Sequence, residues 1–246
     1  MAITLLDGYV SVPDSGYACL VRRNAGTWRS FTITSTENNY YSSFMLSFVT
    51  KAVAAYPSEV NLTGSIINGF TNLKTGAAVT MSLSVPSEVA NILGYASTSI
   101  TNIIGTAGRT ATYQSNHYLY LPRKVLMDDY ESETINARVN SDTNLYTTTY
   151  GIRRKRELKL RFTGFPRSTS PNEYAYAKAF YESVVNQGKK VLYYPDAATT
   201  TSVYNEKTNP YGYEECICEA PNDFKPDKLV SSWDYHHTAN LRLYKL

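Results

Sequence analysis

Apolar and polar residues alternate along this chain in short runs, and the two periods of that alternation predict strands and helices. A period of two over residues 79–85 predicts a strand with one buried face. Another strand is expected over residues 28–34. A helix is expected over about 42–56, where the apolar stripe is Met45, Phe48, Val49, Ala52, Val53 and Tyr56. Ser42 or Ser43 can cap this helix, and Pro57 lies just past its end.

Turn residues divide the rest of the first half into short elements. Asn68-Gly69 favours a tight hairpin, because both residues tolerate positive φ angles. Pro86 opens a helical turn over Ser87–Leu93, and Gly94 is placed to end it. Residues 96–116 are rich in Ser, Thr, Gly and Asn, so we expect a long polar surface loop or arm there. The chain returns to strand at 117–121.

The second half of the chain is predicted to contain a strand, a helix and three further strands. Residues 153–162 form a basic strand in which Leu158, Leu160 and Phe162 share one face. The sequence Ser170-Pro171-Asn172-Glu173 has the form of a capping box. The helix that follows, over 173–186, has one apolar side, made of Tyr174, Ala177, Phe180, Tyr181, Val184 and Val185. Gly188 closes it, and strands are expected at Lys190–Tyr194, 213–219 and 235–244.

Two polar stretches lie between these elements and are expected to be linker or loop. One is the acidic Asp128-Asp129-Tyr130-Glu131-Ser132-Glu133, and the other is residues 140–149. We therefore expect two modules, an N-terminal β-rich module with one helix over 1–125 and a C-terminal strand–helix–strand module over 126–246. The expected fold class is α+β and dominated by strands, with antiparallel sandwich-like modules that each carry one packed helix.

Composition agrees with a strand-rich chain and limits its partners. Only 18% of the 246 residues are charged, and 22 are Tyr, a strand former whose ring can pack while its hydroxyl stays solvated. The net charge of +3 is too small to imply a nucleic-acid or anionic-membrane partner. No apolar run approaches the ~20 residues of a membrane span, and the N-terminus lacks the pattern of a signal peptide. We therefore expect assembly in a reducing cytoplasm.

Cysteine and histidine are the best candidates for a metal or nucleophile site, but their spacing matches no known motif. Cys216 and Cys218 lie two residues apart, and His236 and His237 follow about twenty residues on. Zinc pairs usually span a turn with two to four residues and occur with a second pair. On a strand, the cysteines are more simply two small buried hydrophobes, while His236 and His237 point to opposite faces. Because His117 is alone, and no phosphate loop or nucleophile elbow occurs, we expect no enzyme activity, metal or cofactor.

The basic strand supplies the candidate residues for contacts between subunits. These are Arg153, Arg154, Lys155, Arg156, Lys159 and Arg161. Strand geometry divides them between two faces, so a single nucleic-acid groove is not implied, whereas an Arg fork can meet a carboxylate of a neighbouring subunit. The acidic residues at 128–133 have three possible roles: a solvated loop, which we expect, the binding of a cation, or a contact with this basic run.

Two stretches resemble modules of virion proteins of tailed bacteriophages. The first runs from Phe31-Thr32-Ile33 through Asn39-Tyr40-Tyr41, a helix and a hairpin to Leu93-Gly94-Tyr95. It resembles a module in which an Ile-Pro-x-Gly-Asn-Tyr start leads to a helix, paired strands and a Leu-Gly-Phe ending. The second comprises residues 158–162, the helix at 173–186 and residues 188–196, and is similar to the strand–helix–strand of tail-tip and tail-tube proteins. In those proteins a helix packs on a β-sandwich that closes into a ring of subunits.

The resemblance implies a structural virion protein. It would be a subunit of a distal-tail or baseplate ring, expected to be hexameric, that binds copies of itself, anchors other tail proteins and is assembled in the host cytoplasm. An alternative of the same class is a collar, head-associated or fibre-adaptor protein. An alternative of another class is a carbohydrate-binding sandwich module with Trp28 and Trp233 as stacking platforms, although burial in the core is a competing fate for both.

Overall fold

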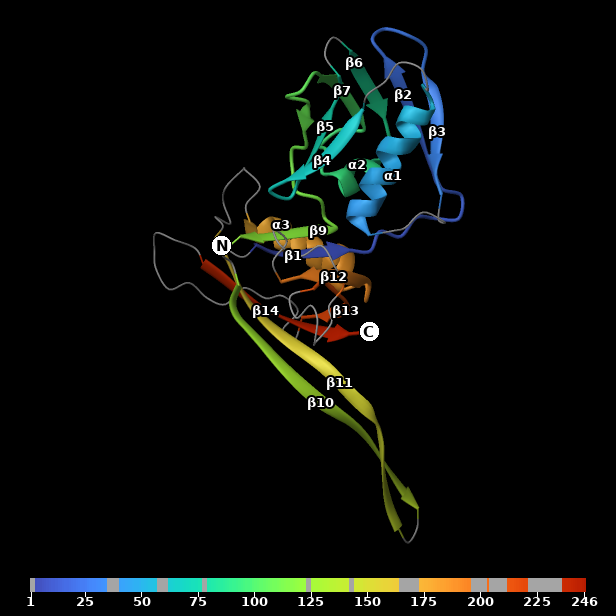
Figure 1. Cartoon of the computed structure of the whole chain (residues 1–246). Helices are drawn as coiled ribbons and strands as arrows, with labels where there is room; N and C mark the ends of the chain where they lie inside the picture. Colours follow the sequence, from blue (N-terminus) through green and yellow to red (C-terminus); the bar gives the residue numbers. More distant parts are fainter. Residues whose placement is uncertain are drawn as a thin grey trace.

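The computed structural model describes residues 3–34, 40–56, 62–76, 79–122, 125–141, 144–163, 173–195, 203, 212–220 and 236–246. Within these residues the chain forms three antiparallel sheets, of seven, four and three strands, together with several helices (Figure 1). The expected β-dominated α+β fold class is confirmed. None of the helices in these ranges is long and apolar enough to span a membrane.

The two smaller sheets and two helices build the first hydrophobic core. The four-stranded sheet has the order β3-β2-β6-β7, with β2 at Tyr17–Arg23, β3 at Arg29–Ile33, β6 at Thr80–Ser84 and β7 at Ser99–Ile104. The three-stranded sheet has the order β4-β5-β8, with β4 at Thr63–Ile67, β5 at Phe70–Lys74 and β8 at Arg109–Thr110. The helices are α1 (Tyr41–Ala54) and α2 (Ser87–Leu93).

Helix α1 buries the stripe that its sequence predicts. The buried residues include Met45, Phe48, Val49 and Ala52. The Phe48 ring meets Phe31 of β3 edge-on, with ring centroids 5.4 Å apart. The helix therefore packs on the four-stranded sheet through the periodic apolar face.

The start of α1 differs from the expectation. Ser42 and Ser43 both lie inside the helix, and its N-cap residue, Tyr40, makes no side-chain capping bond. The free backbone N–H of Ser42 donates instead to the carboxylate of Asp7, at 3.3 Å, and the Ser42 hydroxyl donates to the same carboxylate. The prediction of a serine cap was wrong because the acceptor comes from a strand thirty-five residues earlier in the chain.

The two turn predictions of the first half are confirmed. Asn68 and Gly69 join β4 to β5 with φ angles of 52° and 85°, as a type I′ hairpin turn requires. Helix α2 ends at Gly94, whose φ is 80°. A Cβ at that position would lie 2.2 Å from the carbonyl oxygen of Tyr113, so glycine is needed there for space as well as for conformation.

Residues 96–116 were expected to form a long polar loop, and this prediction was wrong, because β7 and β8 lie within them. Ile100 and Ile103 of β7 are both buried in the first core. Their spacing of three residues hides the strand period, because β7 bulges: Ile100 and Ile103 oppose β6 residues only two apart. Asn102, with a φ of 58°, marks the extra residue of the bulge.

The largest sheet has the order β10-β11-β14-β13-β12-β1-β9. Its strands are β1 (Ile3–Gly8), β9 (Tyr118–Pro122), β10 (Val125–Ser141), β11 (Asn144–Thr163), β12 (Lys190–Tyr194), β13 (Glu214–Glu219) and β14 (His236–Lys245). Two strands from residues 1–125, β1 and β9, thus pair in the same sheet as the strands of the second half. β1 is an interior strand of this sheet, between β12 and β9.

The second hydrophobic core lies between this sheet and the helix predicted over 173–186. The α-helix α3 (Glu173–Phe180) continues as a π-helix, Tyr181–Val185, which the sequence does not signal. Four of the six predicted apolar residues are buried: Ala177, Phe180, Val184 and Val185. The helix segment ends near Gly188, whose φ is 60°, as expected. The other three residues of the proposed capping box, 170–172, lie outside the described residues.

The polar stretches at 128–133 and 140–149 were expected to be linker or loop, and both predictions were wrong. The acidic stretch lies in β10, and all but two of the residues 140–149 lie in β10 or β11. These strands form a two-stranded ribbon over much of their length, so no core imposes an alternation of apolar and polar residues on them.

Candidate functional site

The most prominent feature of the molecule is a hairpin that leaves the seven-stranded sheet (Figure 1). Strand β11 pairs with β14 only from Lys155 to Thr163, whereas its pairing with β10 continues to Asn144. Residues 132–141 and 144–154 therefore form a two-stranded ribbon outside the sheet, which we call the arm. At a rise of ~3.3 Å per residue the arm is about 35 Å long.

The sequence of the arm favours this extended ribbon. Thr, Tyr, Val and Ile recur along its strands, and these residues fit a pleated surface. Ile135 opposes Gly151 and Asn136 opposes Thr149, so Tyr150 is an extra residue on β11. Such a bulge increases the twist of the ribbon. Within the described residues neither outer edge of the arm pairs with another strand, so backbone N–H and C=O groups line both edges.

The distal part of the arm has an unusual composition for an exposed edge. Residues 139–141 and 144–152 contain no charged residue and no proline. Edge strands of natural proteins are commonly protected from pairing with other chains by charges or proline. Residues 139–141 and 144–152 lack both, and Asp142 is the one charged residue in the sequence between these two ranges.

The base of the arm brings together the acidic stretch and the basic run. The register sets Glu131 opposite Lys155 and Glu133 opposite Arg153. Opposite charges at facing positions of an antiparallel pair stabilise it by ~0.2–1 kcal/mol each. The acidic residues at 128–133 were expected to be solvated, to bind a cation or to face the basic run. The register agrees with the last of these roles.

Arg156 points toward the second core. Its side chain is 15% exposed, and its Nη2 lies 3.3 Å from Oε1 of Glu214, which is 3% exposed. Its Nη1 donates to the hydroxyl of Tyr193 at 3.1 Å. Arg156 therefore makes its ion pair within its own chain. Of the other five cations of the basic run, Arg153, Arg154, Lys155, Lys159 and Arg161, only the strand positions in β11 are described.

The structure describes one of the two candidate stacking residues, Trp28, and not the other, Trp233. Trp28 is half-buried, and the guanidinium of Arg22 lies over its ring at 4.6 Å from the centroid. One face of this ring is thus covered by the protein's own cation and is closed to a stacked sugar. Trp233 lies outside the described residues.

Cys216 and Cys218 lie side by side on the inner face of β13. Both are buried in the second core, between the outward-facing Glu215 and Glu219. Burial raises the pKa of Cys216 to about 12 and raises that of Cys218 as well. Among the described residues no three His, Cys, Asp or Glu side chains group as metal ligands would. Both thiols thus have the surroundings of small core residues. The side chains of His236 and His237 are not among those described.

None of the cysteines is expected to react quickly with a thiol reagent in the native protein. Cys19, Cys216 and Cys218 are all buried and free, and only an accessible thiolate attacks a disulfide reagent. Ellman's reagent at pH 8 should modify the native protein slowly, and should modify three thiols per chain in urea. Fast modification of one native thiol would contradict this burial, and Cys→Ala variants would identify the residue.

The two hydrophobic cores meet at a carboxylate that sequence patterns do not reveal. Asp7 of β1 is 1% exposed and binds the first turn of α1 through Ser42. Burial raises its pKa from 3.8 to about 6. Next to it, the Tyr40 hydroxyl donates to Glu215 of β13. These bonds tie the helix of the first core to the sheet of the second.

Comparison with protein-family profiles, with curated protein sequences and with solved structures finds no significant match to this chain.

Proposed function

We propose that this protein is a structural assembly subunit that uses its arm to pair with a neighbouring copy of itself. The observation that carries this proposal is the ribbon of 144–154 and its partner strand, which extends beyond every other strand of the sheet. An isolated two-stranded hairpin is at best marginally stable in water. A neighbouring strand or surface would supply the burial that the arm lacks in a single chain.

Strand addition is the binding mode that the arm fits. Main-chain hydrogen bonds to an open edge give affinity in such complexes, and side chains on the ribbon faces give specificity. The uncharged composition of 139–141 and 144–152 leaves no like-charge barrier between adjoining edges. The charges at the base of the arm oppose one another across the ribbon, which leaves the distal arm as the part best suited to contact a neighbour.

A ring at the tail tip or baseplate of a tailed bacteriophage is the setting that we propose. An arm that binds a different surface of the next copy makes a heterologous contact, and such contacts generate a ring when the rotation closes. The resemblance of residues 158–162 and 173–196 to tail-tip proteins supports this setting over a collar, head or fibre-adaptor position. In this role the protein binds copies of itself and other tail proteins and catalyses no reaction.

Removal of the arm is expected to abolish self-association and to leave the fold intact. Residues 132–154 would be replaced by Asn-Gly, because Glu131 and Lys155 face each other and suit a two-residue turn. The full chain should form a closed oligomer in native mass spectrometry and rings in negative-stain electron microscopy. The shortened chain should be a monomer with an unchanged circular dichroism spectrum. A full chain that stays monomeric at high concentration, or an oligomer that survives the deletion, would contradict the proposal.

A matched pair of variants tests whether association depends on the distal arm or only on added charge. Tyr146→Lys with Thr148→Lys places two charges on the distal arm and is expected to block association. Leu46→Lys with Thr50→Lys places two charges on the exposed face of α1 and should leave the oligomer unchanged. Equal effects of the two changes would show that charge alone, and not the arm edge, controls assembly.

A further inference from the structure

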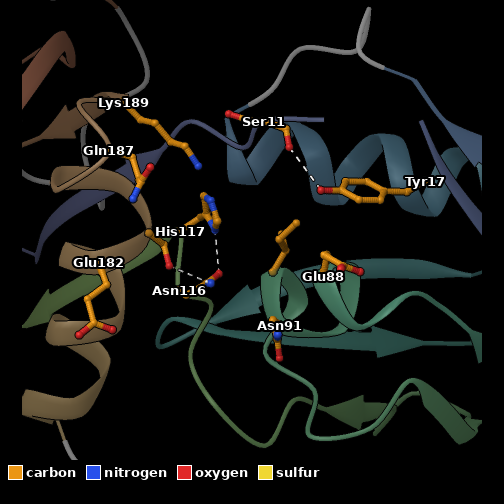
Figure 2. Close-up of a pocket in the computed structure, with 11 residues that line it drawn as sticks. Ser11, Tyr17, Glu88, Asn91, Asn116, His117, Glu182, Gln187 and Lys189 are labelled. Atoms are coloured by element: carbon orange, nitrogen blue, oxygen red, sulfur yellow. Dashed lines mark hydrogen bonds between the residues drawn. The ribbon is translucent and has the colours of Figure 1, made fainter. Parts of the chain in front are cut away.

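A polar pocket opens between the two hydrophobic cores (Figure 2). Its volume is about 340 Å³, near the lower end of the range for small-molecule sites. One wall comes from the first core and includes Tyr17 of β2 and Asn91 of α2. The other wall comes from the second core and includes His117, Ser183 of the π-helix and Lys189. Pockets at the junction of two packed units are common ligand sites.

Lys189 supplies the inner charge of this pocket. Its backbone is fixed because its N–H donates to the carbonyl of Val184 at 3.0 Å and the preceding Gly188 takes a φ of 60°. Figure 2 shows its side chain reaching toward His117. The residue is half-buried, and burial lowers its pKa. In the part of the chain that is described, no carboxylate lies within ion-pair distance of its ammonium.

The floor beside Lys189 is a fixed hydrogen-bonded chain. Asn116 donates through Nδ2 to the Ser183 hydroxyl at 3.0 Å. Its Oδ1 lies 2.7 Å from Nδ1 of His117 and can only accept, so Nδ1 of His117 carries the proton. Burial and the nearby Lys189 charge lower the pKa of His117 to about 3. The imidazole is therefore neutral, and Lys189 is the cation of the inner pocket.

The two acids of the pocket lie at its rim. Glu88 and Glu182 are both exposed, so water and salt screen their charges. Glu182 also pairs with Lys178 at 3.7 Å on its own helix. Among the described residues Lys189 has no carboxylate within ion-pair distance, and its half-buried ammonium is screened less than these rim charges, so the inner part of the pocket presents a positive charge.

We propose that this pocket binds a small hydroxylated carboxylic acid of about the size of a sugar acid, with its carboxylate on Lys189. One ammonium matches one carboxylate. The side-chain amide of Gln187 and the hydroxyl of Tyr17 match the hydroxyl groups of such a ligand. Tyr17 now donates to the carbonyl of Ser11 at 3.4 Å, a long bond that a ligand hydroxyl can replace. This site does not depend on assembly through the arm.

Glucuronate and glucose form a matched pair of probes, because they differ only by a carboxylate in place of a hydroxymethyl group. Calorimetric titration at constant ionic strength is expected to give a dissociation constant of about 1–10 mM for glucuronate. Glucose should bind about tenfold more weakly or not at all. Equal affinity for the two sugars would overturn the proposal. No detectable binding of glucuronate at a concentration well above the expected dissociation constant, on the order of 0.1 M, would also overturn it.

Variants of Lys189 test the same contact from the side of the protein. Lys189→Met should weaken glucuronate binding about tenfold or more, and Lys189→Arg, which keeps the charge, should retain most of it. Lys51→Met on the far part of α1 is the control and should have no effect. Unchanged binding by Lys189→Met, with its circular dichroism spectrum intact, would place the ligand elsewhere and overturn the proposal.

The imidazole of His117 gives a readout that a structural defect would not imitate. A carboxylate bound at Lys189 offsets that positive charge, so the pKa of His117 should rise from about 3 when glucuronate binds. The Hε1 resonance of His117, followed by NMR from pH 4 to 7, where the carboxyl group of glucuronate is ionised, measures this shift. The arm-deleted chain should give the same result, which separates failure of this site from failure of assembly. A His117 titration that glucuronate leaves unchanged would contradict the proposed position of the carboxylate.

Discussion

Replacement of Arg156 by Ala is expected to lower the free energy of unfolding by about 3–5 kcal/mol. The change leaves Glu214 almost fully buried, with Lys245 at 4.0 Å as the remaining cation among the described residues. It also removes the guanidinium that bonds the hydroxyl of Tyr193. A buried carboxylate without its partner keeps its desolvation cost and loses its compensation. Urea unfolding, followed by tyrosine fluorescence, measures the difference.

Two further variants test whether the loss of stability in Arg156→Ala comes from the unpaired Glu214. The double variant Arg156→Met with Glu214→Leu removes both charges and is expected to cost much less than the single change, because apolar pairs can replace buried ion pairs. Lys190→Ala breaks the neighbouring pair with Glu215, whose side chains are 51% and 42% exposed, and should cost under about 1 kcal/mol. A single variant that is no worse than Lys190→Ala would show that Arg156 is not needed to compensate Glu214.

Asp7→Asn is expected to stabilise the protein at neutral pH and to flatten its stability between pH 4 and 6. Burial raises the pKa of Asp7 from 3.8 to about 6, so the folded state holds the proton more tightly than the unfolded state. The associated stability is present below pH 3.8 and is lost as the pH rises through 6. The difference between the folded and unfolded pKa of this carboxyl corresponds to about 3 kcal/mol. Urea unfolding of both proteins at half-unit steps from pH 3.5 to 8 measures the difference in stability.

The matched variant for this prediction is Asp7→Ala. Asn can still accept a hydrogen bond from the N–H of Ser42, whereas Ala cannot, so the Ala variant should be less stable than the Asn variant by about 1 kcal/mol. Both variants should lack the pH dependence that belongs to Asp7. Parallel stability curves for the wild type and Asp7→Asn would mean that burial does not destabilise the ionised carboxylate.

The sequence predicts those elements whose faces meet a core directly. The stripe of α1, strand β6 and the Asn68-Gly69 turn each follow from local chemistry, and all three are present. The expected alternation of β6 is incomplete, because Ser82 is buried together with Met81 and Leu83. Strand β7 is hidden because a bulge at Asn102 breaks its period. The strand predicted over 153–162 lies within β11, but β10 and the part of β11 before residue 153 are hidden for another reason. Their outer parts pair only with each other, so no buried face selects apolar residues.

The residues of the two proposed sites were harder to predict, because their roles arise from tertiary contacts. The basic run predicted contacts between subunits for β11. The inward position of Arg156 depends instead on its ion pair with Glu214 on β13. Lys189 is the first of two consecutive lysines and belongs to no evident motif in the sequence, so its significance comes only from its position beside His117. The cap of α1 by Asp7 joins residues thirty-five apart, a distance at which no capping pattern applies. The uncharged Thr and Tyr residues of 144–150 favour a strand, and this composition could have predicted the arm.

The position of β1 inside the large sheet constrains the order in which the chain can fold during synthesis. Its partner β9 follows within about 120 residues, but its other partner, β12, is made only at residues 190–194. At ~5–20 residues per second, β1 is exposed on one edge for roughly 10 s or more after it leaves the ribosome. The first core, built from residues 10–111, can close during that interval. We expect the second core to remain open until late in translation, so premature termination after β9 would release a chain in which one edge of the interior strand β1 is unpaired.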